Sequence, residues 1–152
     1  MIEALREDLR TIDALISALY DTISGNAGER DWDRFRALFL PGARLLRTDR
    51  SLGGATSQQL DVEGFIAAAA RNLATSAFYE QEVARRTERF GAIAHVFSTY
   101  EARSALDAAP FARGINSIQL FEDDSGWRVA ALAWDEETPD NAIPTEYLVV
   151  HA

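Results

Sequence analysis

Apolar residues recur at alternating steps of three and four along residues 2–23 of the chain. The series is Ile2, Leu5, Leu9, Ile12, Ile16, Leu19 and Ile23. This spacing places them on one face of an amphipathic helix. The polar segment 24–28, which contains two glycines, is suited to end that helix. We therefore predict one long helix over residues 2–23.

A second, short helix is expected after Asp31, which is a good N-cap residue. The apolar residues that follow it have helical spacing: Trp32, Phe35, Leu38 and Phe39. Pro41 and Gly42 end this helix. The next segment, 43–48, is expected to form a short strand, and the segment 49–54 a flexible loop.

From residue 77 onward the pattern changes from helical spacing to strand alternation. Before that point, Asp61 is placed to cap a third helix from Val62 to about Thr75. The segments 78–89 and 93–103 flank a turn at Gly91, and 115–122 and 127–135 flank the turn sequence DDSG, so two hairpins are predicted. Helices followed by an antiparallel sheet indicate an α+β fold. With no repeat or linker in the sequence, we expect a single domain over residues 1–152.

Composition limits the chemistry open to the chain. Hydrophobic residues make up 47% of its 152 residues and charged residues 26%, so the chain can build a core and remain soluble. All 15 basic residues are arginine, which excludes any mechanism based on a lysine Schiff base. Against 24 acidic residues they leave a net charge of −9. Such a surface makes nucleic acids and anionic membranes poor partners.

The chain has no cysteine, and its two histidines are His95 and His151. Disulfides, thiol nucleophiles and thiolate or histidine-rich metal sites are therefore excluded. We expect neither a metal nor another cofactor. The N-terminal sequence MIEALREDLR is acidic, unlike a signal peptide, and no apolar run reaches about 18 residues. We expect a cytoplasmic protein.

Several motifs, taken in order, resemble those of one superfamily. Tyr20 lies near the end of the first helix, and the segments 30–39 (RDWDRFRALF) and 41–45 (PGARL) follow. Later, 93–96 (IAHV) and 126–129 (GWRV) resemble sheet strands. Together these motifs resemble the nuclear transport factor 2-like (NTF2-like) superfamily, also described as SnoaL-like or cystatin-like.

This resemblance extends over residues 8–136 and implies a cone-shaped fold. In such a fold a curved antiparallel sheet wraps around three N-terminal helices, with a pocket at the open end. Members are often homodimers. They include isomerases, dehydratases and cyclases as well as proteins that only bind ligands.

Two mechanisms of the superfamily do not carry over to this chain. Resemblance to ketosteroid isomerase would require a helical tyrosine, matched by Tyr20, an aspartate base and a second acid. The base position falls at or near Arg47, and the acid position falls around Asn116 or Ser117. Scytalone dehydratase shares the DWD helix start but uses two histidines and a tyrosine–aspartate pair that the chain lacks.

The strand 93–103 has two distinct faces. Its even positions are small or apolar and are expected to face the helices: Ala94, Val96, Ser98, Tyr100 and Ala102. Its odd positions, His95 among them, are expected to face outward. The outer face carries an apolar patch that needs a cover: Ile93, Phe97, Ile115 and Phe121. The tail 136–152 or a second copy of the chain could supply that cover, and we expect the second copy, as a homodimer.

Charged residues crowd the strand 78–89: Glu80, Glu82, Arg85, Arg86, Glu88 and Arg89. Carboxylates two residues apart share a face, and such a pair can raise one pKa for acid–base work. We expect instead a solvated or interfacial ladder of ion pairs with Glu101 and Arg103. The acidic segment 135–137 is expected to be a solvated strand end rather than a metal site.

Eight residues are expected to line the pocket: Tyr20, Trp32, Phe39, Phe65, Ser98, Tyr100, Asn116 and Trp134. Aromatic walls with a few polar anchors are typical of a small-molecule site. We expect a domain that binds a small hydrophobic molecule without strong catalysis. The alternative is an isomerase, dehydratase or cyclase in which Tyr20 donates a hydrogen bond and Asn116 or Ser98 orients the substrate. A scaffold with a filled cone stays open as well.

An inward-facing base distinguishes binding from catalysis. A carboxylate or His95 in the pocket with a perturbed pKa would favour the enzyme. Aromatic, amide and hydroxyl groups alone would favour binding.

Overall fold

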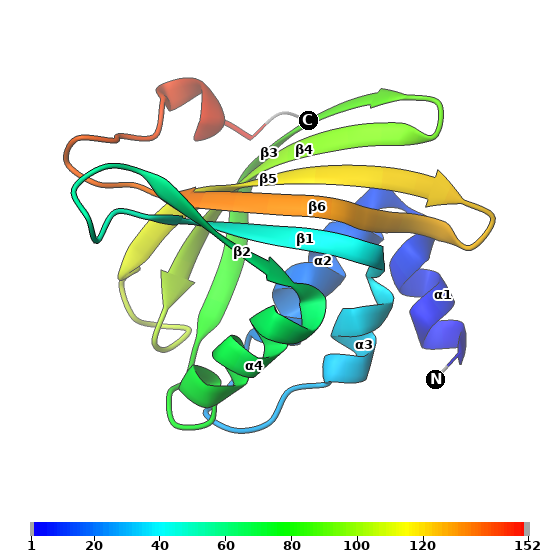
Figure 1. The fold of residues 1–152 in the computed structure, drawn as a ribbon, viewed down its shortest axis with the longest axis horizontal. Coiled ribbons are helices and arrows are strands. Elements are labelled where there is room, and N and C mark those ends of the chain that lie inside the picture. Colours follow the sequence, from blue (N-terminus) through cyan, green and yellow to red (C-terminus); the bar gives the residue numbers. More distant parts are fainter. Residues whose placement is uncertain (1, 151–152) are drawn as a thin grey trace.

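A computed structural model describes residues 2–150 of the chain, and the side chains of Ile2 and Leu5 in the expected helical stripe lie outside what it describes. The helices are α1 (Ile2–Arg10), α2 (Ile12–Ile23), α3 (Trp32–Ala37), α4 (Val62–Leu73) and the short 3-10 helix η1 (Thr145–Tyr147). The strands are β1 (Phe39–Asp49), β2 (Thr56–Asp61), β3 (Tyr79–Phe90), β4 (Ile93–Arg103), β5 (Ala112–Asp123) and β6 (Gly126–Glu136). The expected α+β class is confirmed (Figure 1).

The strands form one six-stranded sheet in the order β2-β1-β6-β5-β4-β3. The two predicted hairpins are present as β3–β4 and β5–β6. The sheet is mostly, not wholly, antiparallel, because β1 pairs with β6 in parallel. The pattern of residues within a strand does not specify the direction of a neighbour from a distant part of the chain, so the sequence could not indicate this pairing.

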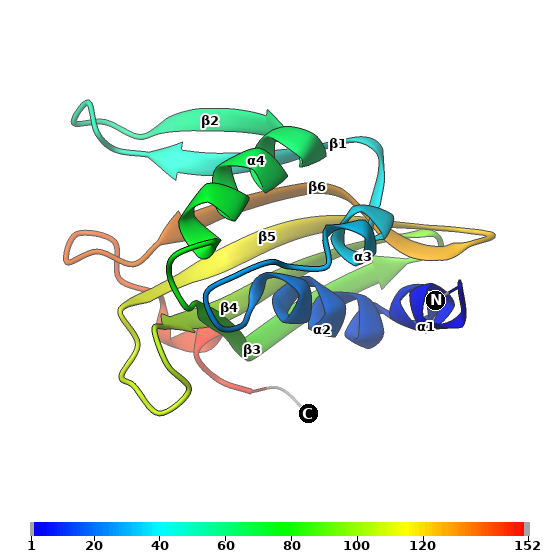
Figure 2. The same cartoon turned by 90° about the horizontal axis from the view of Figure 1, so that it is seen from below.

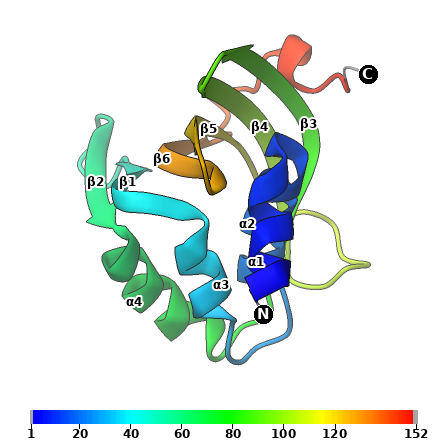
Figure 3. The same cartoon turned by 90° about the vertical axis from the view of Figure 1, so that its right-hand side faces the viewer.

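The sheet curves, and its concave face holds the four α-helices (Figures 2 and 3). The layer between sheet and helices is the hydrophobic core. Its largest fully buried side chains include Trp127 at the start of β6, Leu15 and Ile16 of α2, and Ile118 of β5. This arrangement matches the expected cone of a sheet around helices. No helix of residues 2–150 is long and apolar enough to cross a membrane.

The long N-terminal helix predicted over residues 2–23 is two helices, so four α-helices rather than three pack against the sheet. Thr11 has an extended backbone, with φ −135° and ψ 160°, and its side chain accepts a hydrogen bond from the Ala14 N–H. It is therefore the N-cap of α2. The apolar stripe continues across this break from Leu9 to Ile12, which is why hydrophobic spacing alone did not reveal it.

The short helix begins as predicted, since the Asp31 side chain accepts from the Arg34 N–H. It ends earlier than predicted, and Phe39 is already the first residue of β1. A glycine at position 42, with φ +80°, lies within this strand rather than after a helix.

Strand β2 was not predicted. Its sequence, TSQQLD, is polar and its side chains are almost all exposed, so no alternation of apolar residues marks it. It is an edge strand that pairs with β1 alone. Asp61, its last residue, also caps α4 as expected by accepting from the Gly64 N–H.

The C-terminal segment crosses the convex face of the sheet, opposite the helices (Figure 1). Thr99 of β4 donates a hydrogen bond through its Oγ1 to the Tyr147 carbonyl, at 2.6 Å. The Phe97 and Tyr147 rings pack with their centroids 5.2 Å apart. The tail therefore covers part of the outer face.

The two faces of β4 are those predicted, apart from Thr99, which the tail buries. Outside the tail, Ile93 is 48% and Phe121 is 42% exposed, so the apolar patch is only partly covered. His95 lies on this outer face, where its Nε2 is 2.9 Å from a Glu88 carboxylate oxygen.

Candidate functional site

A cavity lies on the concave side of the sheet, between its inner face and helices α2, α3 and α4. Its volume is about 80 Å³. Six of the eight residues expected at a pocket line it: Tyr20, Phe39, Phe65, Tyr100, Asn116 and Trp134. Most of the other lining residues are apolar: Leu19, Ile23, Phe35, Leu45, Ile118 and Leu132.

Four aromatic rings form one wall of the cavity. Phe35 of α3 stacks on Phe65 of α4 with ring centroids 5.4 Å apart, and it contacts Phe39 at 4.8 Å. Phe65 in turn meets Trp134 of β6 edge-on at 6.0 Å. Such offset and edge-on pairs are the preferred geometries of aromatic rings.

Trp32 and Ser98 do not line the cavity. Trp32 is half-buried at the start of α3, with its ring edge-on to Phe35 at 5.4 Å. Ser98 is fully buried on β4, where its hydroxyl lies 2.6 Å from the Tyr20 hydroxyl. Ser98 thus lies behind Tyr20 and supports it from the sheet side.

A carboxylate that the sequence analysis did not place here also lines the cavity. Glu80, at the start of β3, receives a hydrogen bond from the Asn116 amide on its Oε1 at 3.4 Å. Its backbone N–H donates to the Ser24 hydroxyl at 3.0 Å, which fixes the start of β3 against the end of α2. Glu80 was expected in a solvated or interfacial ladder of ion pairs, and this expectation was wrong, because Glu80 lines the cavity.

A β-bulge explains why Glu80 faces inward. Near the hairpin turn, β3 residues pair with β4 in a register that places Glu88 opposite His95, on the outer face. The register shifts between Glu82 and Ala84, so that Glu82 lies opposite Tyr100. A one-residue shift turns every later side chain to the other face. Both Glu82 and Glu80 therefore point toward the helices.

Burial raises the pKa of Glu80 from its ordinary 4.5 to about 7. The hydrogen bond from Asn116 opposes this rise in pKa, and the negative charge of Glu136 adds to it. Glu80 therefore meets the condition of an inward-facing acid or base with a perturbed pKa.

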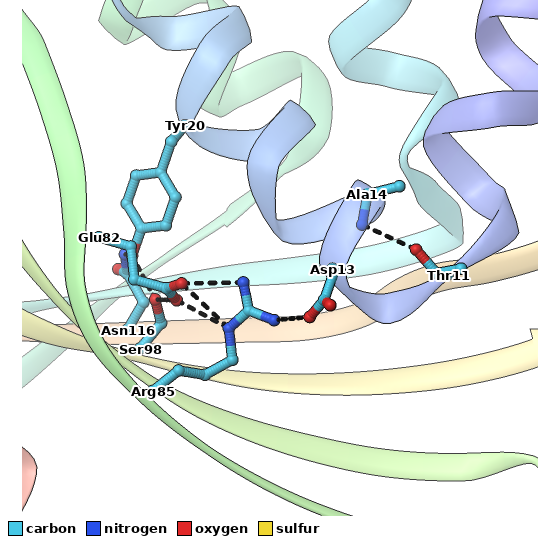
Figure 4. A network of polar contacts seen from close by, with 8 residues as sticks. All are labelled: Thr11, Asp13, Ala14, Tyr20, Glu82, Arg85, Ser98 and Asn116. Carbon is cyan, nitrogen blue, oxygen red and sulfur yellow. Dashed lines mark hydrogen bonds and ion pairs between the residues drawn. The ribbon is translucent and has the colours of Figure 1, made fainter. Parts of the chain in front are cut away.

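A chain of polar groups connects Asn116 to the surface (Figure 4). The Asn116 amide donates to the Tyr20 hydroxyl at 3.0 Å, and the Ser98 hydroxyl donates to a carboxylate oxygen of Glu82. Arg85 holds Glu82 at 2.8 Å and also pairs with Asp13, on α2.

The donors in this chain can be assigned from chemistry. The Arg85-paired carboxylate of Glu82 can only accept, so it takes the single Ser98 proton. Ser98 must then accept from Tyr20, whose hydroxyl in turn accepts from Asn116. The Tyr20 proton is thus directed toward the sheet and away from the cavity. Burial raises the pKa of Tyr20, so the phenol stays neutral.

Other charged side chains of the sheet form ion pairs. Arg103 pairs with Glu101 at 2.7 Å, where both side chains are largely buried, and Arg89 reaches Glu122 at 3.5 Å in a more exposed position. Among residues 2–150, no three histidine, aspartate or glutamate side chains are grouped as a metal site.

No family model and no curated protein matches the chain. The chain is similar to solved structures. A protein of unknown function with a cystatin-like fold, from Nostoc punctiforme, has a TM-score of 0.64 at 12% identity, covering 84% of this chain and 90% of its own. An uncharacterised cystatin-like protein from Caulobacter vibrioides has a TM-score of 0.64 at 18% identity, covering 85% and 89%.

An NTF2-like protein of unknown function from Silicibacter pomeroyi has a TM-score of 0.56 at 16% identity, covering 83% of this chain and 92% of its own. The chain therefore has the NTF2-like, or cystatin-like, fold that the sequence motifs indicated. These three neighbours have no known function, so their similarity extends to the fold alone.

Proposed function

We propose that the chain binds a small, mainly apolar molecule in the cavity and that Glu80 exchanges a proton with it, as in an isomerase or a dehydratase. The observation that carries this proposal is a carboxyl group with a pKa of about 7 that faces an apolar cavity. A group with such a pKa is populated in both protonation states near neutral pH, which suits general acid–base catalysis.

The size of the cavity restricts the ligand. At about 80 Å³, it has roughly half the volume of an engineered protein cavity of about 150 Å³ that binds benzene. A ligand is therefore a compact molecule or the inserted end of a larger one. Its apolar part would contact Phe65 and Trp134, and its polar part would lie near Glu80 and Asn116.

Removal of an acidic C–H proton is the simplest test of Glu80 as a base. In D₂O near neutral pH, we expect the protein to accelerate deuterium exchange at the carbon atoms next to the carbonyl of 2-butanone. Glu80→Gln keeps the size of the side chain and removes the base, so it should lower the protein-dependent rate by roughly 100-fold. Proton NMR measures the rate directly.

Glu88→Gln is the matched control, because it removes the same charge from the same strand on the outer face. Its exchange rate should equal that of the wild type. Equal rates in the wild type and Glu80→Gln would contradict the catalytic proposal. Binding of butanone without exchange would leave a binding protein, the function first expected from the sequence.

We also propose that two copies of the chain pair through the outer sheet face. The patch of Ile93, Phe97 and Phe121 stays partly exposed beside the tail, and contiguous apolar surface of this kind is typical of interfaces. Phe97→Glu and Phe121→Glu should each lower the mass measured by light scattering from twice the chain mass to the chain mass.

Leu52→Glu serves as the control for the dimer. Leu52 is 88% exposed in the turn between β1 and β2, at the opposite edge of the sheet from β4, so a negative charge there should leave the mass unchanged. Phe121→Glu separates the interface from the tail, since Phe97, but not Phe121, packs on Tyr147. A monomeric wild type at micromolar concentration would refute the proposal.

A further inference from the structure

We propose that Tyr100 donates the hydrogen bond that recognises the ligand, that this ligand is a small carbonyl compound, and that Tyr20 is a positioning residue. The inference rests on the proposed function in one respect: it takes the cavity as the binding site and Glu80 as its base.

The first argument is the state of the two phenols. The Tyr20 hydroxyl donates its hydrogen bond to Ser98, so it has no proton left to donate to a ligand. Within residues 2–150, by contrast, no group accepts a hydrogen bond from the Tyr100 hydroxyl, although Tyr100 is only 4% exposed and lines the cavity. The Tyr100 hydroxyl is also not fully enclosed by the protein. Among residues 2–150, Arg128 Nε is the only fully enclosed side-chain nitrogen or oxygen atom that has no hydrogen-bond partner.

The second argument is the space that the strands leave for the Tyr100 hydroxyl. Gly114 lies opposite Tyr100 on β5, and a Cβ atom at this position would be 2.5 Å from the hydroxyl oxygen and 2.4 Å from the Asp135 carbonyl. Only glycine leaves room for the phenol here. A buried phenol normally has a partner, so its open donor is suited to an oxygen atom that enters the cavity.

The third argument is the relation of Tyr100 to Glu80. Both side chains line the cavity from neighbouring strands. Burial raises the pKa of Tyr100, and the negative charge of Glu80 raises this pKa further, so the two groups are electrostatically coupled. A neutral donor and a carboxylate that share an apolar cavity match a carbonyl oxygen and the acidic C–H bond beside it.

The chemical step balances with these two groups alone. The Glu80 carboxylate takes a proton from the carbon next to the carbonyl, and the C–H electron pair forms the C=C bond of an enolate. The carbonyl π electrons move to oxygen, where the Tyr100 O–H donates a hydrogen bond without transferring its proton. Glu80, now protonated, returns a proton to carbon.

Tyr20 acts on this step indirectly, through Asn116. It accepts from the Asn116 amide, which also holds Glu80, and it donates to Ser98 on the sheet. Its role is to orient Asn116, and through it the carboxylate of Glu80.

The test uses 2-butanone labelled with ¹³C at the carbonyl, together with 2-methyl-1-butene, which replaces the oxygen by a CH₂ group. Binding to the wild type should move the carbonyl resonance in the direction of a stronger hydrogen bond. Tyr100→Phe should abolish this shift and weaken butanone binding by roughly three- to ten-fold, the worth of one hydrogen bond. It should leave binding of the alkene unchanged.

Tyr20→Phe should keep the carbonyl shift and lower the exchange rate. If Tyr100→Phe keeps the shift, or if Tyr20→Phe alone abolishes it, the assignment is wrong. Should Tyr100→Phe not fold, the wild type still decides: tyrosine-labelled protein must show nuclear Overhauser effects from the Tyr100 ring to bound butanone.

The two proposals fail separately. A carbonyl shift that depends on Tyr100, without any exchange that depends on Glu80, would overturn the catalytic role of Glu80 and support Tyr100. Exchange that depends on Glu80 with a shift that persists in Tyr100→Phe would do the reverse. Absence of butanone binding to the wild type would overturn both.

Discussion

Replacing Phe35 with alanine is expected to lower the free energy of unfolding by about 3–5 kcal/mol, the usual cost of truncating a buried aromatic residue. Phe35 is 2% exposed and lies between three other rings, at 5.4 Å from Trp32, 4.8 Å from Phe39 and 5.4 Å from Phe65. Its loss would separate α3 from α4. Because whole domains are stable by only about 5–15 kcal/mol, urea denaturation should show a much lower midpoint.

Trp32→Ala is the informative comparison, because the sequence pattern gives Trp32 and Phe35 the same helical spacing after Asp31. Trp32 is only half-buried and contacts Phe35 at its edge. We therefore expect a loss of about 1–2 kcal/mol, typical of a partly buried substitution. A loss for Trp32→Ala as large as that for Phe35→Ala would show that α3 packs through Trp32 instead.

The second large effect is a dependence of stability on pH. The free energy of unfolding should fall as the pH rises from about 5 to 8, and Glu80→Gln should remove this dependence. The pKa of Glu80 is about 7 in the folded chain against an ordinary 4.5. The folded state therefore binds more protons than the unfolded state between these values, and its stability is lost as the pH rises through 7. At 1.36 kcal/mol per pKa unit, the loss is about 3 kcal/mol.

The free energy of unfolding of Glu80→Gln should equal that of the wild type near pH 5 and exceed it by about 3 kcal/mol at pH 8. Urea unfolding at several pH values measures this difference. The neighbouring carboxylates Asp135 and Glu137 do not add to this effect, because Arg50 lowers the pKa of Asp135, and the Ile143 N–H and Arg113 lower the pKa of Glu137. Groups with a lowered pKa lose their stabilising effect only in more acidic solution.

The surface variant Glu88→Gln should follow the pH dependence of the wild type. If Glu80→Gln does so too, Glu80 is not held in an apolar environment, and the basis of the proposed function fails. A protein that keeps a carboxylate at this cost in stability is consistent with a functional site, since such sites are commonly less stable than they could be.

Much of the candidate site could be predicted from side-chain type and local spacing. Tyr100 and Asn116 lie on strands whose alternation is regular on the inner face, and Phe65 belongs to a helix with a clear cap at Asp61. Ser98 was placed on the correct face, but its hydroxyl contacts the Tyr20 hydroxyl, and Tyr20 rather than Ser98 lines the cavity. The periodicity of a strand or helix does not indicate which of two inward-facing groups lies closer to the cavity.

Glu80 was missed for a different reason. Counting back from the turn at Gly91, strand alternation places Glu88 outward and predicts the same for Glu80. The shift between Glu82 and Ala84 reverses this order, and it has no sequence signature such as a glycine. A bulge depends on how two strands and the helix beneath them pack, so it is a property of the tertiary structure.

The sequence by itself determined the hairpins β3–β4 and β5–β6, the helix caps at Asp31 and Asp61, and the α+β class, because each depends on contacts between residues near in the chain. Only the tertiary structure decided the parallel pairing of β1 with β6, the edge strand β2 and the inward turn of Glu80. These features depend on partners far apart in sequence, which local propensity and periodicity do not report.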